Sequence, residues 1–116
     1  MAPDADDALL AQLRRGTLQF CVLALLAGEP RYAFDVVRDL GEVEGMVTSE
    51  GTIYPLLSRL RRDGLVSTSW RESTSGPPRR YYELTAAGLA ALEHFTDQWR
   101  MFSSAVDHLL AGRATT

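Results

Sequence analysis

The sequence has little of what disulfide bonding, metal binding or membrane insertion requires. A single cysteine, Cys21, excludes an internal disulfide and a cysteine-based metal cluster. Because Cys21 lies within an apolar run, we interpret it as a small buried hydrophobic residue, with a redox sensor as the alternative. No apolar run approaches the roughly 20 residues of a membrane span, and the N-terminus is acidic instead of basic and then apolar. We therefore expect no membrane association, no secretory signal and a cytoplasmic location.

Histidine is nearly as scarce, which weighs against catalysis. The two histidines, His94 and His108, are 14 residues apart on one predicted helix. Since helical neighbours lie three or four residues apart, the two cannot share a site within one chain, and we expect both to face solvent. We predict that the protein is not an enzyme, with no catalytic residues, no metal site and no cofactor.

The charge of the chain is unevenly distributed. The net charge is −3, which by itself argues against a nucleic-acid partner. However, residues 50–83 carry six arginines against four acidic residues, whereas residues 1–49 carry four arginines against eight acidic residues. Because the local field decides what a surface attracts, residues 50–83 are the candidate for contact with phosphate.

The most informative pattern lies in this positive segment, between Thr48 and Gly64. The apolar residues recur at helical spacing, and they are Ile53, Leu56, Leu57 and Leu60. The opposite face carries hydrogen-bonding and cationic groups: Thr52, Tyr54, Ser58, Arg59, Arg61 and Arg62. Thr48 or Ser49 is expected to cap the helix, and Gly64 to end it in the left-handed conformation. Such a polar face suits the DNA major groove, with Tyr54 and Arg59 as base contacts; a core helix with a solvated face is the alternative.

Two helices are expected before this one. The first spans residues 9–27, with a restart at Thr17 as an alternative because Gly16 is a poor helix former. Its apolar face comprises Leu10, Leu13, Leu18, Val22, Leu25 and Leu26. The second spans residues 32–40, with Phe34, Val37 and Leu40 inside. The helix-turn-helix plan is matched by the helix over residues 32–40 and the helix that follows it between Thr48 and Gly64, which carries the basic polar face.

After Gly64 the period changes to two. Val66, Thr68 and Trp70 share one face of a predicted strand, and residues 79–84 form the returning strand. Residues 73–78 between them are turn formers. The product is a β-hairpin with Arg79 and Arg80 near its tip. Directly after a DNA-reading helix, such a hairpin is typical of the wing of a winged helix, although the two arginines could instead protect a sheet edge.

A last helix is predicted from Thr85 to about Ala111. Its apolar residues follow the alternating three- and four-residue steps of a helix that pairs with another helix, and they are Leu92, Phe95, Trp99, Phe102, Val106 and Leu109. The rest of so short a chain offers little to cover this stripe, so a second copy of the chain is the natural partner.

Several segments resemble the PadR family of bacterial transcriptional regulators. They include Arg15-Gly16-Thr17-Leu18, Gly51-Thr52-Ile53-Tyr54-Pro55-Leu56-Leu57, and the run from Gly76 to Thr85 (Gly-Pro-Pro-Arg-Arg-Tyr-Tyr-Glu-Leu-Thr). The single terminal helix resembles the short, LmrR-like subfamily, in which a tryptophan at the position of Trp99 lines a pore at the dimer interface. Pro55 agrees with the family pattern, and we expect it to distort the first turn of its helix.

The resemblance implies a homodimeric repressor of mainly α (α+β) class, a winged helix-turn-helix that binds an inverted-repeat operator in double-stranded DNA. A planar hydrophobic effector would relieve repression. We expect a flexible N-terminus (1–8), a DNA-binding domain (9–84) and a dimerisation helix (85–112). The predicted DNA contacts are Ser49, Thr52, Tyr54, Pro55, Ser58, Arg59, Arg62, Pro78, Arg79 and Arg80. The six apolar residues from Leu92 to Leu109 are expected at the dimer interface and the effector site. The alternative is a winged-helix protein-interaction module that does not bind DNA.

Overall fold

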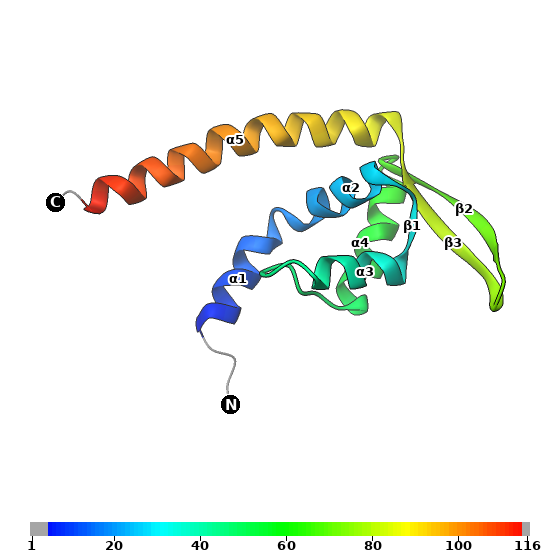
Figure 1. The fold of residues 1–116 in the computed structure, drawn as a ribbon. Coiled ribbons are helices and arrows are strands. Elements are labelled where there is room, and N and C mark those ends of the chain that lie inside the picture. Colours follow the sequence, from blue (N-terminus) through cyan, green and yellow to red (C-terminus); the bar gives the residue numbers. More distant parts are fainter. Residues whose placement is uncertain (1–4, 115–116) are drawn as a thin grey trace.

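A head of helices and a small sheet carries one long helix that extends beyond it (Figure 1). The structure is a computed structural model that describes residues 5–114. The helices are α1 (Ala5–Arg15), α2 (Leu18–Gly28), α3 (Ala33–Gly41), α4 (Glu50–Arg62) and α5 (Ala86–Ala114), and the strands are β1 (Arg31–Tyr32), β2 (Val66–Ser73) and β3 (Gly76–Leu84).

The core of the head is formed where α2, α3 and α4 meet. All four apolar residues of the stripe predicted on α4, from Ile53 to Leu60, are buried there. Their partners are Leu18, Val22, Leu23 and Leu26 of α2, Val36 and Leu40 of α3, and Val66 of β2. Removal of this apolar surface from water is the main force that holds the three helices together. The stripe read from the sequence therefore identifies the inner face of α4 correctly.

The helix expected over residues 9–27 is two helices, as the alternative restart at Thr17 allowed. The chain bends by 67° between them. The helix also begins at Ala5, ahead of the expected start, and residues 1–4 of the expected flexible N-terminus lie outside the described residues. The bend turns Leu10 and Leu13 away from the core, and they are exposed instead of continuing the inner face of α2.

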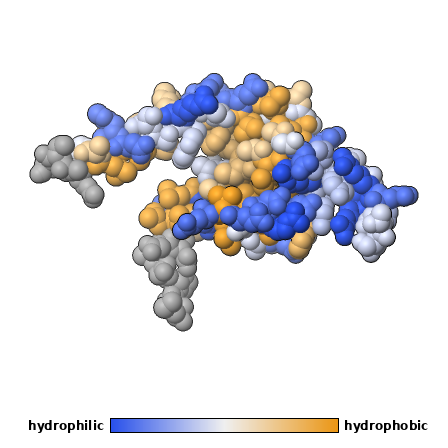
Figure 2. Space-filling view, viewed as in Figure 1, coloured by the Kyte–Doolittle hydropathy of each residue, from blue (hydrophilic) through white to orange (hydrophobic). Residues whose placement is uncertain are grey.

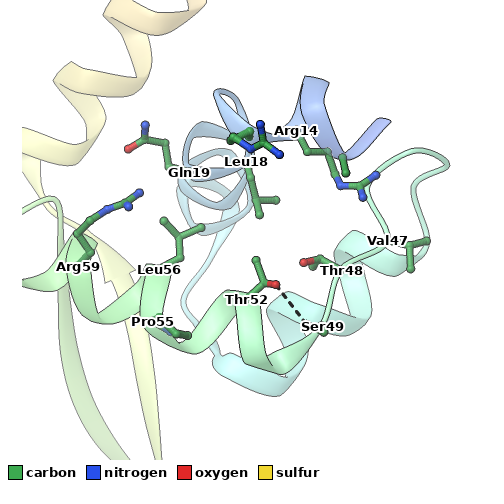
Figure 3. Close-up of a pocket in the computed structure, with 12 residues that line it drawn as sticks. Arg14, Leu18, Gln19, Val47, Thr48, Ser49, Thr52, Pro55, Leu56 and Arg59 are labelled. Atoms are coloured by element: carbon green, nitrogen blue, oxygen red, sulfur yellow. Dashed lines mark hydrogen bonds between the residues drawn. The ribbon is translucent and has the colours of Figure 1, made fainter. Parts of the chain in front are cut away.

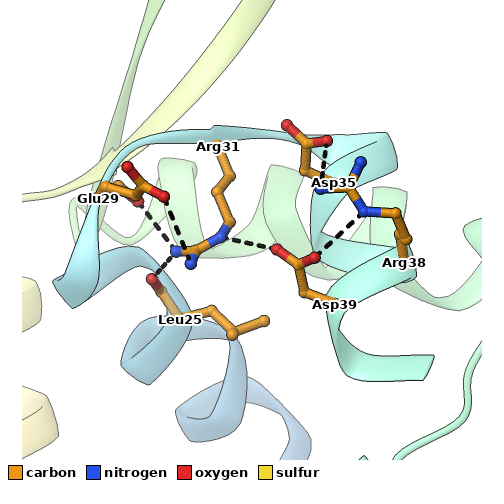
Figure 4. Close-up of polar contacts among 6 residues, drawn as sticks. All are labelled: Leu25, Glu29, Arg31, Asp35, Arg38 and Asp39. Atoms are coloured by element: carbon orange, nitrogen blue, oxygen red, sulfur yellow. Dashed lines mark hydrogen bonds and ion pairs between the residues drawn. The ribbon is translucent and has the colours of Figure 1, made fainter. Parts of the chain in front are cut away.

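A network of ion pairs fixes α3 against the end of α2 (Figure 4). The Nε of Arg31 donates to Asp39 at 2.9 Å, and its Nη1 donates to the backbone carbonyls of Leu25 and Glu29. Arg38 pairs with the same Asp39, and this side-chain hydrogen bond raises the pKa of Arg38. The network thereby sets the angle of α3, the helix that precedes α4.

One residue of α3 lies elsewhere than expected. Phe34 was predicted on the inner face of α3, but it is exposed. Val36, which was not predicted there, is fully buried on that face instead. The helix starts at Ala33 behind Tyr32, which belongs to β1. The first turn of α3 is therefore held beside the sheet, and Phe34 projects at that edge instead of into the core.

The sheet has the antiparallel order β1-β3-β2, so β3 is central. The β2–β3 hairpin was predicted, whereas the two-residue strand β1 was not, because two residues carry no periodic signal. Trp70 and Arg80 are cross-strand partners. Although Trp70 shares a face with buried Val66, its side chain is 65% exposed, because the hairpin continues past the core. The outer half of the hairpin thus projects into solvent (Figure 1).

The long helix α5 is attached to the head only through its first part. Thr85 caps it: its Oγ1 accepts from the N–H of Gly88 at 3.0 Å and donates to the carbonyl of Gly64 at 2.7 Å. Leu92 and Phe95 are partly buried, and beyond Phe95 the apolar side chains become exposed. Within residues 5–114, no single helix is both long and apolar enough to span a membrane.

Candidate nucleic-acid interface

Helix α4 presents a continuous polar surface beside the hairpin. Gly64 has the predicted left-handed conformation, with φ of 78°, which lets the chain turn from α4 into β2. The capping expectation is wrong in its detail: Ser49 is the N-cap residue, but its side chain makes no capping bond. Its hydroxyl lies 3.2 Å from the hydroxyl of Thr52 instead. Pro55 lies within the assigned helix, which continues through it.

The exposed surface of α4 has a crest and two flanks. An α-helix turns about 100° per residue, so Gly51 and Arg62 lie along a crest opposite the buried stripe. Tyr54 lies on one side of this crest, and Thr52 and Arg59 lie on the other. A hollow in the molecular surface adjoins each flank.

The first hollow, which we call the α1–α4 hollow, has a volume of about 760 Å³. Four of its lining residues are predicted DNA contacts: Ser49, Thr52, Pro55 and Arg59. Figure 3 shows them facing side chains of α1 and α2 across the hollow. The lining residues on α1 and α2 include Arg14, Arg15 and Gln19, none of which is among the predicted DNA contacts.

The second hollow, the wing hollow, has a volume of about 340 Å³ and joins α4 to the hairpin. Four further predicted contacts line it: Tyr54, Ser58, Arg79 and Arg80. The fold thus brings two residues of α4 together with the two arginines near the hairpin tip. The lining also includes four aromatic residues, which are Tyr32, Phe34, Trp70 and Tyr82.

The two hairpin arginines are held by stacking on aromatic rings. The guanidinium of Arg80 lies over Trp70, 5.0 Å from the ring centroid, and that of Arg79 lies over Tyr32 at 4.7 Å. Such contacts are favourable because the ring face is electronegative. Adjacent residues of a strand point to opposite faces, so the two guanidinium groups approach the hollow from different sides of the hairpin.

The remaining two predicted contacts line neither hollow. Arg62 is exposed in the last turn of α4, and Pro78 is exposed near the hairpin tip. The pairing of Trp70 with Arg80 could have been found from the hairpin register alone. The approach of Arg15 and Gln19 to α4 could not, because it depends on the bend between α1 and α2.

The residues predicted on α5 divide into two groups. Phe95 stacks on Phe20 of α2 with centroids 4.1 Å apart, and Trp99 continues the stack 6.0 Å further on. Trp99 is 46% exposed, so part of its ring is open to a further partner. We call the apolar stripe from Leu92 to Leu109 the seam of α5. Its outer residues Phe102, Val106 and Leu109 are also exposed.

The histidines and the cysteine were considered in the sequence as candidate reactive groups. Among the residues that the structure describes, no three His, Cys, Asp or Glu side chains gather where they could hold a metal ion. His94 and His108 are exposed, as predicted. Cys21 is half-buried, and burial raises the pKa of its thiol, which disfavours the reactive thiolate.

A helix-turn-helix followed by an antiparallel hairpin, with a polar helix face and cationic residues on the hairpin, defines the winged-helix class. The predicted fold class is therefore confirmed. Residues 22–94 match the transcriptional regulator PadR-like family, and the chain belongs to that family.

Similar proteins support this assignment. The chain is 39% identical over 107 residues to the transcriptional regulator Rv3488 of Mycobacterium tuberculosis, covering 92% of this chain and 95% of that protein. It is also similar to a PadR-like regulator from Bacillus cereus (TM-score 0.79, 36% identity, 85% of this chain and 96% of that one). A PadR family regulator from Eggerthella lenta has a TM-score of 0.79 and 37% identity, with 89% of each chain covered.

Proposed function

We propose that this protein is a transcriptional repressor that binds operator DNA as a homodimer and is released from it by a planar hydrophobic effector. One observation carries the DNA-binding part: the wing hollow unites Tyr54 and Ser58 of α4 with Arg79 and Arg80 of the hairpin. A helix in the major groove presents side chains to base edges, while cations beside it contact phosphates. On α4, Tyr54 and Ser58 are the proposed base-reading residues. Arg62 and Pro55 lie beside them on the same helix and are further proposed DNA contacts.

Exposed apolar surface supports the homodimer. Phe102, Val106 and Leu109 of α5 and Leu9 and Leu13 of α1 are all exposed large hydrophobic residues. Apolar side chains lie on both sides of the open notch between α5 and α1 (Figure 2). A second copy, related by a two-fold axis, would cover this surface with the same surface of its own.

The half-exposed ring of Trp99 supports the effector site. It ends the stack that begins at Phe20, so a planar guest could add one more layer. Because Phe20 belongs to α2, a guest at Trp99 would act on a helix of the DNA-binding head. The guest would lower DNA affinity if it favours a different spacing of the two heads.

DNA binding is the first test. The purified protein should shift a duplex from the region upstream of its own gene, and not an unrelated duplex of equal length. In a two-fold dimer, the reading helices contact half-sites about 34 Å, or about ten base pairs, apart. A protected inverted repeat of that spacing, or a multiple of it, is the expected footprint. A dimer that binds no duplex would favour the alternative, a winged-helix module for protein partners.

A further inference from the structure

The α1–α4 hollow is positively charged. Arg14, Arg15 and Arg59 line it, and none of the described residues that line it is acidic. None of the three takes part in the ion pairs formed between described residues. Among the described residues, no carboxylate forms an ion pair with any of the three, so the hollow is suited to a negatively charged partner.

The three arginines are not equivalent. Arg14 donates from Nη1 to the carbonyl of Gly45 at 2.7 Å. It thus holds the loop that leads into α4, and its first role is to position that loop. Arg15 and Arg59 are exposed. Arg15 belongs to α1 and Arg59 to α4, and Gln19 of α2 lines the same hollow. Figure 3 shows Gln19 and Arg59 in this lining.

The placement of the two hollows matches the shape of duplex DNA. The major groove is about 12 Å wide and is walled by the two phosphodiester backbones. A helix inserted into it therefore has one backbone along each flank. In this protein one flank of α4 adjoins the wing hollow with Arg79 and Arg80, and the other adjoins the α1–α4 hollow with Arg15 and Arg59.

We propose that the α1–α4 hollow is a second phosphate-binding site, which holds the backbone on the side of α4 away from the wing. Arg15 and Arg59 contact its phosphates, and Gln19 and Thr52 add neutral hydrogen bonds. Arg59 then acts as a phosphate contact and not as the base-reading residue expected from sequence. This inference rests on the proposed DNA binding. It adds the junction of α1 and α2 to the interface, so that the head holds both strands.

The test measures how DNA affinity depends on salt. Each phosphate contact adds about 0.9 to the slope of log affinity against log salt concentration. Because the bound dimer carries each substitution twice, we expect Arg15→Ala and Arg59→Ala each to lower this slope by about 2, and the double variant by about 4. Arg15→Lys should keep the wild-type slope, because the charge is retained. Arg100→Ala, which removes another exposed arginine, from α5, is the control and should leave the slope unchanged.

The outcomes separate this inference from the proposed function. Wild-type protein that binds no duplex would refute the proposed function itself. Wild-type binding with unchanged slopes in folded Arg15→Ala and Arg59→Ala proteins would overturn only the second phosphate site. A thermal shift with pyrophosphate distinguishes a free anion from the DNA backbone. If pyrophosphate stabilises the wild type but not Arg15→Ala, and the DNA slopes stay unchanged, the hollow binds a free anion and the backbone assignment is wrong.

Discussion

Gly88 of α5 lies directly against the backbone of Leu65: a Cβ on Gly88 would lie 2.0 Å from the carbonyl oxygen of Leu65. The same oxygen accepts a hydrogen bond from the N–H of Thr85 at 3.1 Å. The start of α5 therefore docks, backbone to backbone, on the turn that follows α4. We expect a displacement of α5 at this joint to move the end of α4, since no flexible side chain separates the two backbones.

Gly88→Ala should break this joint. The added methyl group meets backbone that cannot move aside, and we expect a loss of about 3 kcal/mol in the free energy of unfolding, measured by urea denaturation. Gly41→Ala is the matched control, because its Cβ would have nothing within 4 Å. Equal stability of the two variants would contradict the close contact.

The seam of α5 should control assembly. Phe102→Asp or Val106→Asp places an unpaired carboxylate in the proposed interface, and burial of that charge is strongly unfavourable. We expect monomers in sedimentation experiments, with loss of operator binding. His108→Asp is the control, because helical geometry places it on the other side of α5. A wild-type monomer at micromolar concentration would disprove the dimer.

The hairpin arginines should contribute affinity without specificity. Replacement of both Arg79 and Arg80 by alanine should weaken binding to every duplex similarly and flatten the salt dependence. Tyr54→Ala should instead cost on the order of 1–3 kcal/mol at the operator and relax its specificity. Titrations of operator and unrelated duplexes test both effects. Wild-type affinity in the double variant would show that the hairpin is not a wing in function.

The ring of Trp99 should report the effector. Planar cationic dyes or flavonoid-like compounds should quench its emission and lower operator affinity, because a guest stacks on the exposed ring. Measurements need a Trp70→Phe background, since Trp70 is exposed and also emits. Quenching that survives Trp99→Ala, or none across the panel, would leave Trp99 a packing residue.

The thiol of Cys21 should react slowly. Burial raises its pKa above the ordinary value of 9.0, so the folded protein holds its proton to higher pH than the unfolded chain does. This group should therefore leave the free energy of unfolding unchanged below about pH 9 and lower it as the pH rises further. Alkylation by iodoacetamide near pH 8 should be slower in native protein than in urea. Equal rates would favour the redox-sensor alternative.

Local patterns in the sequence determined the elements of this protein. The stripe from Ile53 to Leu60 identified the buried face of α4, and the positive φ at Gly64 followed from the need to end a helix in a tight turn. The change to a period of two identified the hairpin. These features depend on residues within one or two turns of each other, so spacing and residue type are enough to predict them.

Only the tertiary structure decided how these elements meet. Leu13 fits the periodic face of one long helix, yet the bend after Arg15 exposes it and brings Arg15 beside α4. Phe34 has the residue type of a core position, yet β1 holds the start of α3 at the sheet edge and leaves it exposed. Both hollows are formed by residues far apart in the chain. Helical period constrains only neighbours on one element, whereas the angle between elements follows from the packing of the whole core.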